Sequence, residues 1–201
     1  NGRLLVIVVG IYHHEDPAVP DLCCAVNDAE TKMMAIRHTQ PADALVLNVL
    51  VDPSRETGVC RPVRDQILAA AHNMGEIATA RDTLMLYYAG HGAIVDAQPC
   101  LFPADVRVEV EETGVTLRHT VEVREVQRLL HACPCPQRVM FLDCCQNKFS
   151  PCAAAENWSA PERSAVHRAV PWRTGLPLSN DLVNAFQQAA PGWSLLFACG
   201  P

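Results

Sequence analysis

Residues 4–11 read Leu-Leu-Val-Ile-Val-Val-Gly-Ile and contain no polar side chain. A strand that is exposed on one face alternates apolar and polar residues, whereas a strand covered on both faces is apolar throughout. We therefore predict that residues 4–11 form the central strand of a parallel sheet with helices on both faces.

Strand and helix patterns alternate along the rest of the chain. Further strands are predicted at 44–51, 84–89, 138–145 and 194–199, with a hairpin or short edge pieces across 101–110. The spacing of apolar residues predicts helices at 25–38 and 63–78, a third from about 120 and a fourth from 179 or 180. This order predicts an α/β fold, a three-layer sandwich with a mostly parallel sheet between two layers of helices.

A single domain over residues 1–201 is expected from the length of the chain. Residues 146–178 hold prolines and small residues without periodicity, which predicts a long loop. The final predicted strand would have an open edge beside apolar side chains, and proteins normally cover such edges. We therefore expect this edge to be covered by a further part of the domain.

Composition limits the classes of function. The chain has 16 basic and 22 acidic residues, a formal net charge of −6, which argues against a general binder of nucleic acid or anionic membranes. No apolar run approaches the length of a membrane span, so a soluble globular protein is predicted. The ten cysteines include adjacent pairs at 23–24 and 144–145, which suit a disulfide framework poorly. Free thiols and a cytoplasmic location are therefore predicted.

Two predicted strand ends carry reactive side chains. Gly90-His91-Gly92 follows one strand, and Asp143-Cys144-Cys145 ends another. The carboxyl ends of parallel strands meet at one edge of a sheet, and a cysteine nucleophile needs a nearby base. We therefore predict a dyad of Cys145 and His91, with a tight glycine turn in which the N–H of Gly92 stabilises an oxyanion. The alternative is that neither residue is catalytic, and that Cys145 is a buried cysteine at a strand end and His91 a polar residue in a turn.

Other motifs point to no cofactor. No glycine-rich phosphate loop follows residues 4–11, which disfavours a flavodoxin-like binding domain. Cys133-Pro134-Cys135 lacks the usual spacing of zinc ligands, so no metal site is predicted. No Asp-rich loop of calcium-ligand spacing is visible, and calcium dependence is left open. The polar residues 13–16 are predicted as a solvated loop at a strand end, where they could rim the cleft.

The sequence resembles the caspase-like cysteine peptidases, and the metacaspase branch of the caspase-hemoglobinase fold in particular. Tyr87-Tyr88-Ala89-Gly90-His91-Gly92 is similar to the histidine strand of that family, and Phe141-Leu142-Asp143-Cys144-Cys145-Gln146 to its nucleophile strand. Ala25-Val26-Asn27-Asp28-Ala29 resembles its Asn-Asp segment. The resemblance covers residues 3 to about 147, and the histidine-to-cysteine separation is close to the roughly 50 residues of caspases.

The resemblance also implies roles for single residues. The family nucleophile stands two positions after an Asp or Gln, which selects Cys145, while Cys144, on the opposite face of the strand, is expected to be a packed thiol. Gln146-Asn147 departs from the glycine-containing turn usual in the family. Asp28 and Asp143 are expected to line the specificity pocket, where two carboxylates favour Arg or Lys before the cleaved bond. The alternative for Asp28 is a solvated acid at a helix N-terminus.

These features together predict a cysteine endopeptidase that cleaves proteins or peptides after Arg or Lys. The resemblance implies a regulated signalling, cell-death or defence pathway, and a small-subunit fragment or larger activating assembly as partner. It also implies that a C-terminal small-subunit part of the domain is lacking. The alternative is a caspase-homology domain that has lost catalysis and serves as a scaffold or binding module.

Overall fold

In the described part of the chain, five parallel strands and two short antiparallel ones form the sheet of the middle layer. The structure is a computed structural model, which describes residues 2–52, 61–95, 98–111, 114–131, 133–147, 184 and 192–197. Its strands are β1 (Leu4–Ile11), β2 (Leu45–Asp52), β3 (Thr83–Val95), β4 (Gln98–Leu101), β5 (Arg107–Glu111), β6 (Gly114–Arg118), β7 (Val121–Glu122), β8 (Gln137–Asn147) and β9 (Ser194–Phe197). Its helices are α1 (Ala25–Thr39), α2 (Arg64–Ile77) and α3 (Val123–His131), with a short 3-10 turn, η1 (Ala42–Ala44).

The parallel strands lie in the order β2-β1-β3-β8-β9. β1 is an interior strand as predicted, but the centre of the sheet is β3, which pairs with β1, β8 and β4. β3 is 13 residues long, and its last residues pair in antiparallel fashion with β4, which in turn pairs with β7. β3 continues past its last pairing with β1 at Ala89, and this extension supplies the edge on which β4 pairs.

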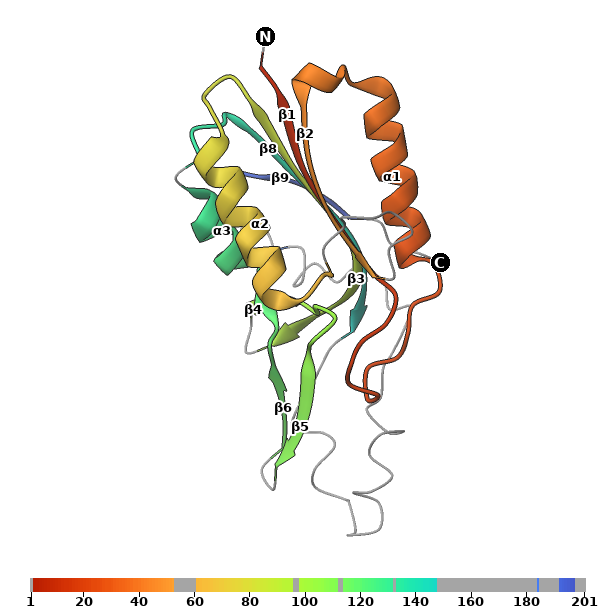
Figure 1. Ribbon diagram of the computed structural model, residues 1–201. Coiled ribbons are helices and arrows are strands. Elements are labelled where there is room, and N and C mark those ends of the chain that lie inside the picture. The colour runs from red at the N-terminus through yellow and green to blue at the C-terminus, as the bar shows by residue number, and fades with distance from the viewer. Residues whose placement is uncertain are drawn as a thin grey trace.

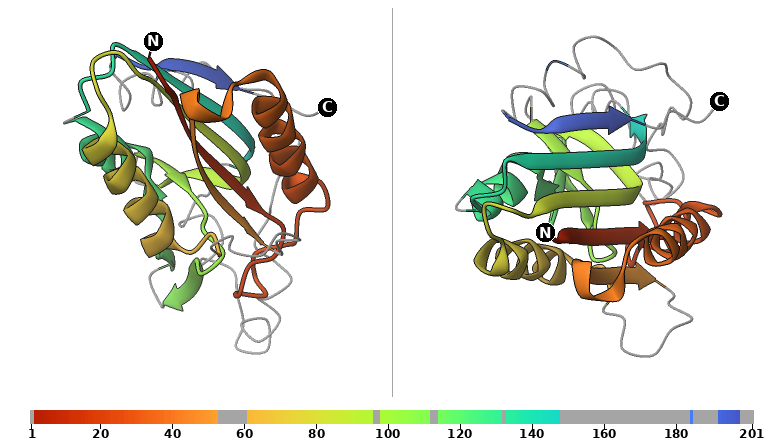
Figure 2. Two further views of the ribbon diagram at one scale, coloured as in Figure 1. Left: turned by 45° about the horizontal axis from the view of Figure 1, so that its top comes forward. Right: turned by 90° about the horizontal axis from the view of Figure 1, so that it is seen from above.

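Helices cover both faces of the sheet, with α1 on one side and α2 and α3 on the other (Figures 1 and 2). Val6 and Val8 of β1 pack with α1, whereas Leu5, Ile7 and Val9 pack on the α2 and α3 side. The side chains on both faces of β1 are thus buried in apolar contacts, which explains why the strand has no polar residue. The predicted three-layer α/β sandwich is confirmed.

α1 lies close to the sheet because β1 has a glycine beneath it. A Cβ atom on Gly10 would lie 2.5 Å from the Cβ of Ala29, closer than real atoms approach. Ala25, Ala29 and Met33 form the buried face of the helix. The close packing brings Asp28, one position before Ala29, to the carboxyl ends of the strands.

Several predicted segments differ from the structure or lie outside its described part. β5 and β6 form a separate two-stranded hairpin that extends away from the main sheet (Figure 1). Of the predicted loop at 146–178, only residues 146 and 147 are described, and they belong to β8. The predicted final helix lies outside the described residues except for residue 184. Within the described residues, no helix has the length and apolar character that crossing a membrane requires.

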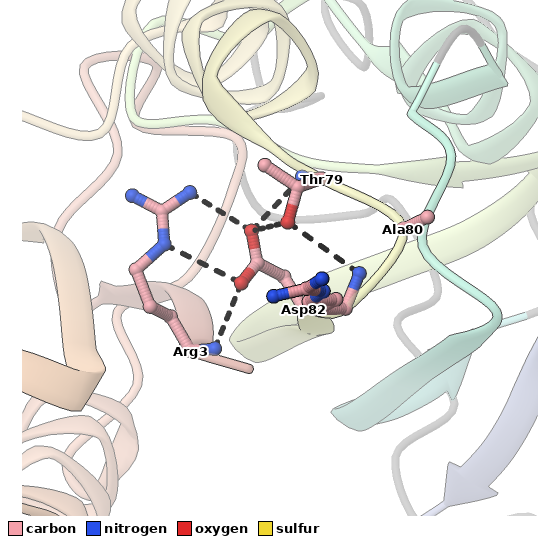
Figure 3. A pocket seen from close by; sticks show the side chains of 5 residues that line it. Arg3, Thr79, Ala80 and Asp82 are labelled. Carbon is pink, nitrogen blue, oxygen red and sulfur yellow. Dashed lines mark hydrogen bonds and ion pairs between the residues drawn. The ribbon is translucent and has the colours of Figure 1, made fainter. Parts of the chain in front are cut away.

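The amino ends of β1 and β3 are joined by a buried carboxylate (Figure 3). Asp82, 2% exposed, accepts hydrogen bonds from the backbone N–H of Arg3 at 2.7 Å and from its Nη2 at 2.8 Å. The N–H and hydroxyl of Thr79 each donate to it at 2.9 Å. These donors hold the pKa of Asp82 well below its usual range, against the effect of burial. In the hollow of about 510 Å³ that these residues line, the Asp82 carboxylate is therefore paired with Arg3, and the hollow lies at the sheet edge opposite His91.

Replacing Asp82 with Asn is expected to lower the free energy of unfolding at pH 7 by about 2 kcal/mol, since a charge-assisted hydrogen bond contributes about 1.5–3 kcal/mol and Arg3 is partly hydrated. The lowered pKa means that this stability is complete above the unfolded pKa, near 4, and is lost as the pH falls below it. Urea unfolding at pH 7 and pH 3 measures both effects. Asp65→Asn, which makes the same charge change at a side chain 91% exposed, should change stability by less than about 0.5 kcal/mol. An equal loss in the two variants would contradict the assignment.

Candidate active site

β3 and β8 bring the two predicted catalytic residues to paired positions. His91 of β3 is the register partner of Cys145 of β8, and Ala89 is the partner of Asp143. Neighbouring strands lie about 4.8 Å apart, and paired positions of parallel strands share a face of the sheet. The face concerned is that of α1, because Tyr87, Ala89 and Phe141, at the same parity, pack with this helix. For Cys145 the structure describes the backbone alone, so the dyad contact itself stays a prediction.

The structure corrects the predicted glycine turn. Gly90, His91 and Gly92 lie inside β3, which continues without interruption to Val95. Gly92 pairs with Gln146 of β8 and with Leu101 of β4. The two glycines mark a close approach of other atoms rather than a turn. The role of Gly92 as an oxyanion donor stays a prediction.

A buried tyrosine explains the first of these glycines. A Cβ atom on Gly90 would lie 2.6 Å from the hydroxyl oxygen of Tyr88, which crosses over the strand at that point. This hydroxyl lies 2.7 Å from the carbonyl oxygen of His91 and 3.0 Å from that of Phe102, and it accepts the N–H of Phe102 at 3.1 Å. Tyr88 thereby anchors the backbone of His91 from the opposite face of the sheet.

The His91 imidazole has one nitrogen whose role is defined by its partner. Nε2 lies 2.8 Å from the carbonyl oxygen of Pro20, and because a carbonyl can only accept, Nε2 must carry the hydrogen. In the neutral ring Nδ1 is then the basic nitrogen. The side chain is 1% exposed, and this burial lowers its pKa, although the Pro20 carbonyl and Asp21 act in the opposite direction. His91 is therefore a neutral base at ordinary pH, oriented by a third group.

The loop between β1 and α1 lies against His91. Two of its residues, which the sequence predicted to be solvated, are buried there. His14 is buried, its ring centroid lies 5.3 Å from that of His91, and its Nε2 lies 3.3 Å from the Phe102 carbonyl oxygen. Burial, with a smaller contribution from His91, lowers the pKa of His14 to about 4. Asp16 is also buried and accepts the N–H groups of Ala18 and Val108. The polar composition of residues 13–16 suggested solvent. This holds for His13, whose side chain is 55% exposed, but not for His14 and Asp16, whose partners Phe102 and Val108 lie some 90 positions away in the sequence.

Sequence reasoning missed Pro20 as a neighbour of His91 and placed His14 only in a solvated loop near the site. Pro20 contributes a backbone carbonyl, which any residue could supply, so no pattern could have identified it. The only signal for His14 is its position in a loop at the carboxyl end of a buried strand, where sites in parallel sheets lie.

Two carboxylates interact on the α1 side of the sheet. The hydroxyl of Tyr87 donates to Oδ2 of Asp143 at 3.3 Å. Partial burial raises the pKa of Asp143, and the negative charge of Asp28 adds to the rise, while Tyr87 and Lys32 oppose it. The pKa of Tyr87 is also raised, by burial and by both carboxylates. The charge of Asp28 therefore acts on the pKa of Asp143, and Asp143 stands two positions before the proposed nucleophile Cys145.

Cys144, the sequence neighbour of the proposed nucleophile, has a buried environment. Cys144 is 4% exposed and belongs to the core on the α2 and α3 side with Met140 and Leu142. This confirms the expectation that Cys144 is a packed thiol. In the described part of the chain, no group of three or more His, Cys, Asp or Glu side chains is arranged to hold a metal ion.

A mostly parallel sheet with a histidine and a cysteine at paired carboxyl-end positions defines a caspase-type class of α/β protein. The family model described as the caspase domain matches residues 22–187, so the chain belongs to this family of cysteine peptidases.

The comparison with solved structures gives a match to the fold. The crystal structure of protein GSU0716 from Geobacter sulfurreducens superposes with a TM-score of 0.53 and 16% sequence identity. The match covers 71% of this chain and 50% of that one, so the chain spans about half the length of that protein. A comparison with curated proteins found no match.

Proposed function

We propose that this protein is a cysteine endopeptidase that cleaves peptide bonds after Arg or Lys, with Cys145 as nucleophile and His91 as base. The observation that carries the proposal is the register pairing of His91 with Cys145 on neighbouring parallel strands. Two further features support it. His91 is held by the Pro20 carbonyl in the tautomer that leaves Nδ1 basic, and the family is one of cysteine peptidases.

The reaction follows from these groups. Nδ1 of His91 takes the proton of the Cys145 thiol, and the thiolate attacks the carbonyl carbon of the substrate. The N–H of Gly92 is proposed to stabilise the negative charge on the carbonyl oxygen. His91 then gives its proton to the leaving amine, and water, deprotonated by His91, hydrolyses the thioester. Nε2 remains bonded to Pro20 throughout, which keeps the ring in place.

The specificity belongs to the same proposal. Asp28 and Asp143 supply a partly buried negative site, in which the pKa of Asp143 is raised first by partial burial and then by repulsion from the charge of Asp28. An arginine or lysine side chain bound there would relieve that repulsion and lower the pKa of Asp143. A cytoplasmic location and a role in a signalling, cell-death or defence pathway accord with the abundant cysteines and the family, and stay part of the proposal.

A peptidyl-arginine electrophile tests the function directly. The reagent should label Cys145 in the wild type, and His91→Ala should slow the labelling because the thiolate loses its base. Mass spectrometry of the digested protein locates the label. Absence of labelling in folded protein would instead support the alternative, a scaffold without catalysis.

The pH dependence gives an independent prediction. His91 must be neutral to act as base, and its lowered pKa keeps it neutral to a lower pH than an exposed histidine. The acid limb of kcat/KM is therefore expected below pH 6.5, the ordinary histidine value. An arginyl fluorogenic peptide measured from pH 5 to 8 gives the profile. A midpoint above 6.5 would contradict the assignment of His91 as the buried base.

A further inference from the structure

Two exposed thiols lie side by side at the start of α1, close to the proposed active site. The Sγ atoms of Cys23 and Cys24 are 3.3 Å apart, and both side chains are exposed. The other cysteines whose side chains are described, Cys100, Cys133, Cys135 and Cys144, are buried. Within that set, solutes can reach only the adjacent pair.

We propose that Cys23 and Cys24 form a redox-sensitive dithiol site, which a hydroperoxide converts to a disulfide that slows the reaction at His91. The effect on catalysis rests on the proposed peptidase function, whereas the dithiol chemistry does not. The proposed modification site lies outside the dyad of His91 and Cys145 and outside the carboxylate pocket, the proposed substrate site of Asp28 and Asp143.

The chemistry requires the hydroperoxide as oxidant. One thiolate attacks the peroxide, its sulfur gains an oxygen, the O–O bond breaks and the leaving oxygen departs as water or alcohol. The second sulfur then attacks the sulfenic acid. The S–S bond forms, the S–O bond breaks, and the departing hydroxide takes the remaining thiol proton as water. In total two thiols are oxidised and one hydroperoxide is reduced.

The resulting disulfide would be easily reduced again. Adjacent residues have Cα atoms about 3.8 Å apart, whereas disulfides normally join Cα atoms about 4.4–6.8 Å apart. Closing the bond between Cys23 and Cys24 therefore requires the peptide between them to move, and strained, exposed disulfides are the labile ones. Such a pair fits a reversible switch better than a permanent cross-link.

The peptide that must move is connected to the site on both sides. Before it, the N–H of Leu22 donates to the Tyr12 carbonyl at 2.9 Å, in the loop whose Pro20 carbonyl binds His91. After it, the carbonyl of Cys24 accepts the N–H of Asp28 at 2.9 Å, in the first turn of α1. Oxidation would therefore disturb both the orientation of His91 and the position of a pocket carboxylate.

The first measurement detects the disulfide without relying on activity. Trypsin cleavage after Arg3 and Lys32 gives a peptide, residues 4–32, whose only cysteines are Cys23 and Cys24. In Cys145→Ala protein treated with hydrogen peroxide, this peptide should resist alkylation and be lighter by two hydrogens, and dithiothreitol should restore two alkylation sites. Cys23→Ser gives the matched control, which cannot close the ring. Two thiols that stay alkylatable, or that pass to sulfinic acid without a disulfide, would overturn the proposal.

The second measurement tests the link to His91. Peroxide is expected to lower the activity of the wild type by about tenfold more than that of Cys23→Ser or Cys24→Ser, which contain the same Cys145. The NMR signal of the His91 ring in Cys145→Ala protein should shift on oxidation and return on reduction, whether or not the protein is a peptidase. An unchanged His91 signal in protein with the 23–24 disulfide would overturn the coupling. Inactivity of every reduced variant, with the signal shifted, would contradict only the peptidase function.

Discussion

Replacing Cys145 with alanine is expected to lower kcat/KM for an arginyl peptide by about 10³ or more, because the covalent step loses its nucleophile. His91→Ala should lower it by a similar factor, and the double variant should lose little more, since the two residues act as one unit. Fluorogenic peptide cleavage by the purified variants, with circular dichroism to check folding, gives these values.

Cys144→Ala is the matched control for the nucleophile. It removes the neighbouring thiol from the core on the α2 and α3 side, so we expect activity within about threefold of wild type and a stability loss of about 1 kcal/mol. A variant at Cys144 that abolishes labelling by the electrophile, with Cys145→Ala still active, would reverse the assignment of the nucleophile.

Asp143→Asn should reduce cleavage after Arg by a factor of about 10–100. This corresponds to loss of one charge-assisted contact of about 1.5–3 kcal/mol in a partly buried pocket. We expect the wild type to cleave after Asp far more slowly than after Arg. This slow cleavage after Asp should not fall further in Asp143→Asn. The ratio of kcat/KM for an Arg peptide to that for a matched Asp peptide measures the effect, and this ratio should fall in the variant.

The control for this charge change lies on the other side of the sheet. Asp65 is an exposed acid on α2, so Asp65→Asn alters the net charge equally but should leave the Arg-to-Asp ratio unchanged. Equal rates for Arg and Asp peptides in the wild type would remove the basis for a carboxylate pocket. A drop in both variants would indicate a general effect of net charge on substrate attraction.

Most elements of the sheet could be predicted because their signals are local. β1, β2 and β8 are apolar runs, and α1 and α2 carry apolar residues at helical spacing, so each element appears within a short window. The place of β3 at the centre could not be predicted, because it depends on pairing with β4 and β8, which follow it in the chain.

The predicted turn at Gly90–Gly92 was wrong for a related reason. Glycine permits turns, but it also permits another group to approach the backbone, and only the position of the Tyr88 hydroxyl distinguishes the two at Gly90. The predicted solvation of residues 13–16 holds for His13, whose side chain is 55% exposed, but it was wrong for His14 and Asp16 because polarity was taken as a sign of exposure. His14 and Asp16 are buried under contacts to Phe102 and Val108.

The sequence by itself determined the α/β class, the order along the chain of the main strands and of α1, α2 and α3, and the residue types of the candidate site, because apolar periodicity and short motifs are properties of neighbouring residues. Only the tertiary structure decided that His91 stands opposite Cys145, that the Pro20 carbonyl defines its tautomer and that its pKa is lowered. Strand register and burial arise from contacts between residues distant in the chain. The acidity and orientation of a catalytic group depend on those contacts more than on its own sequence neighbours.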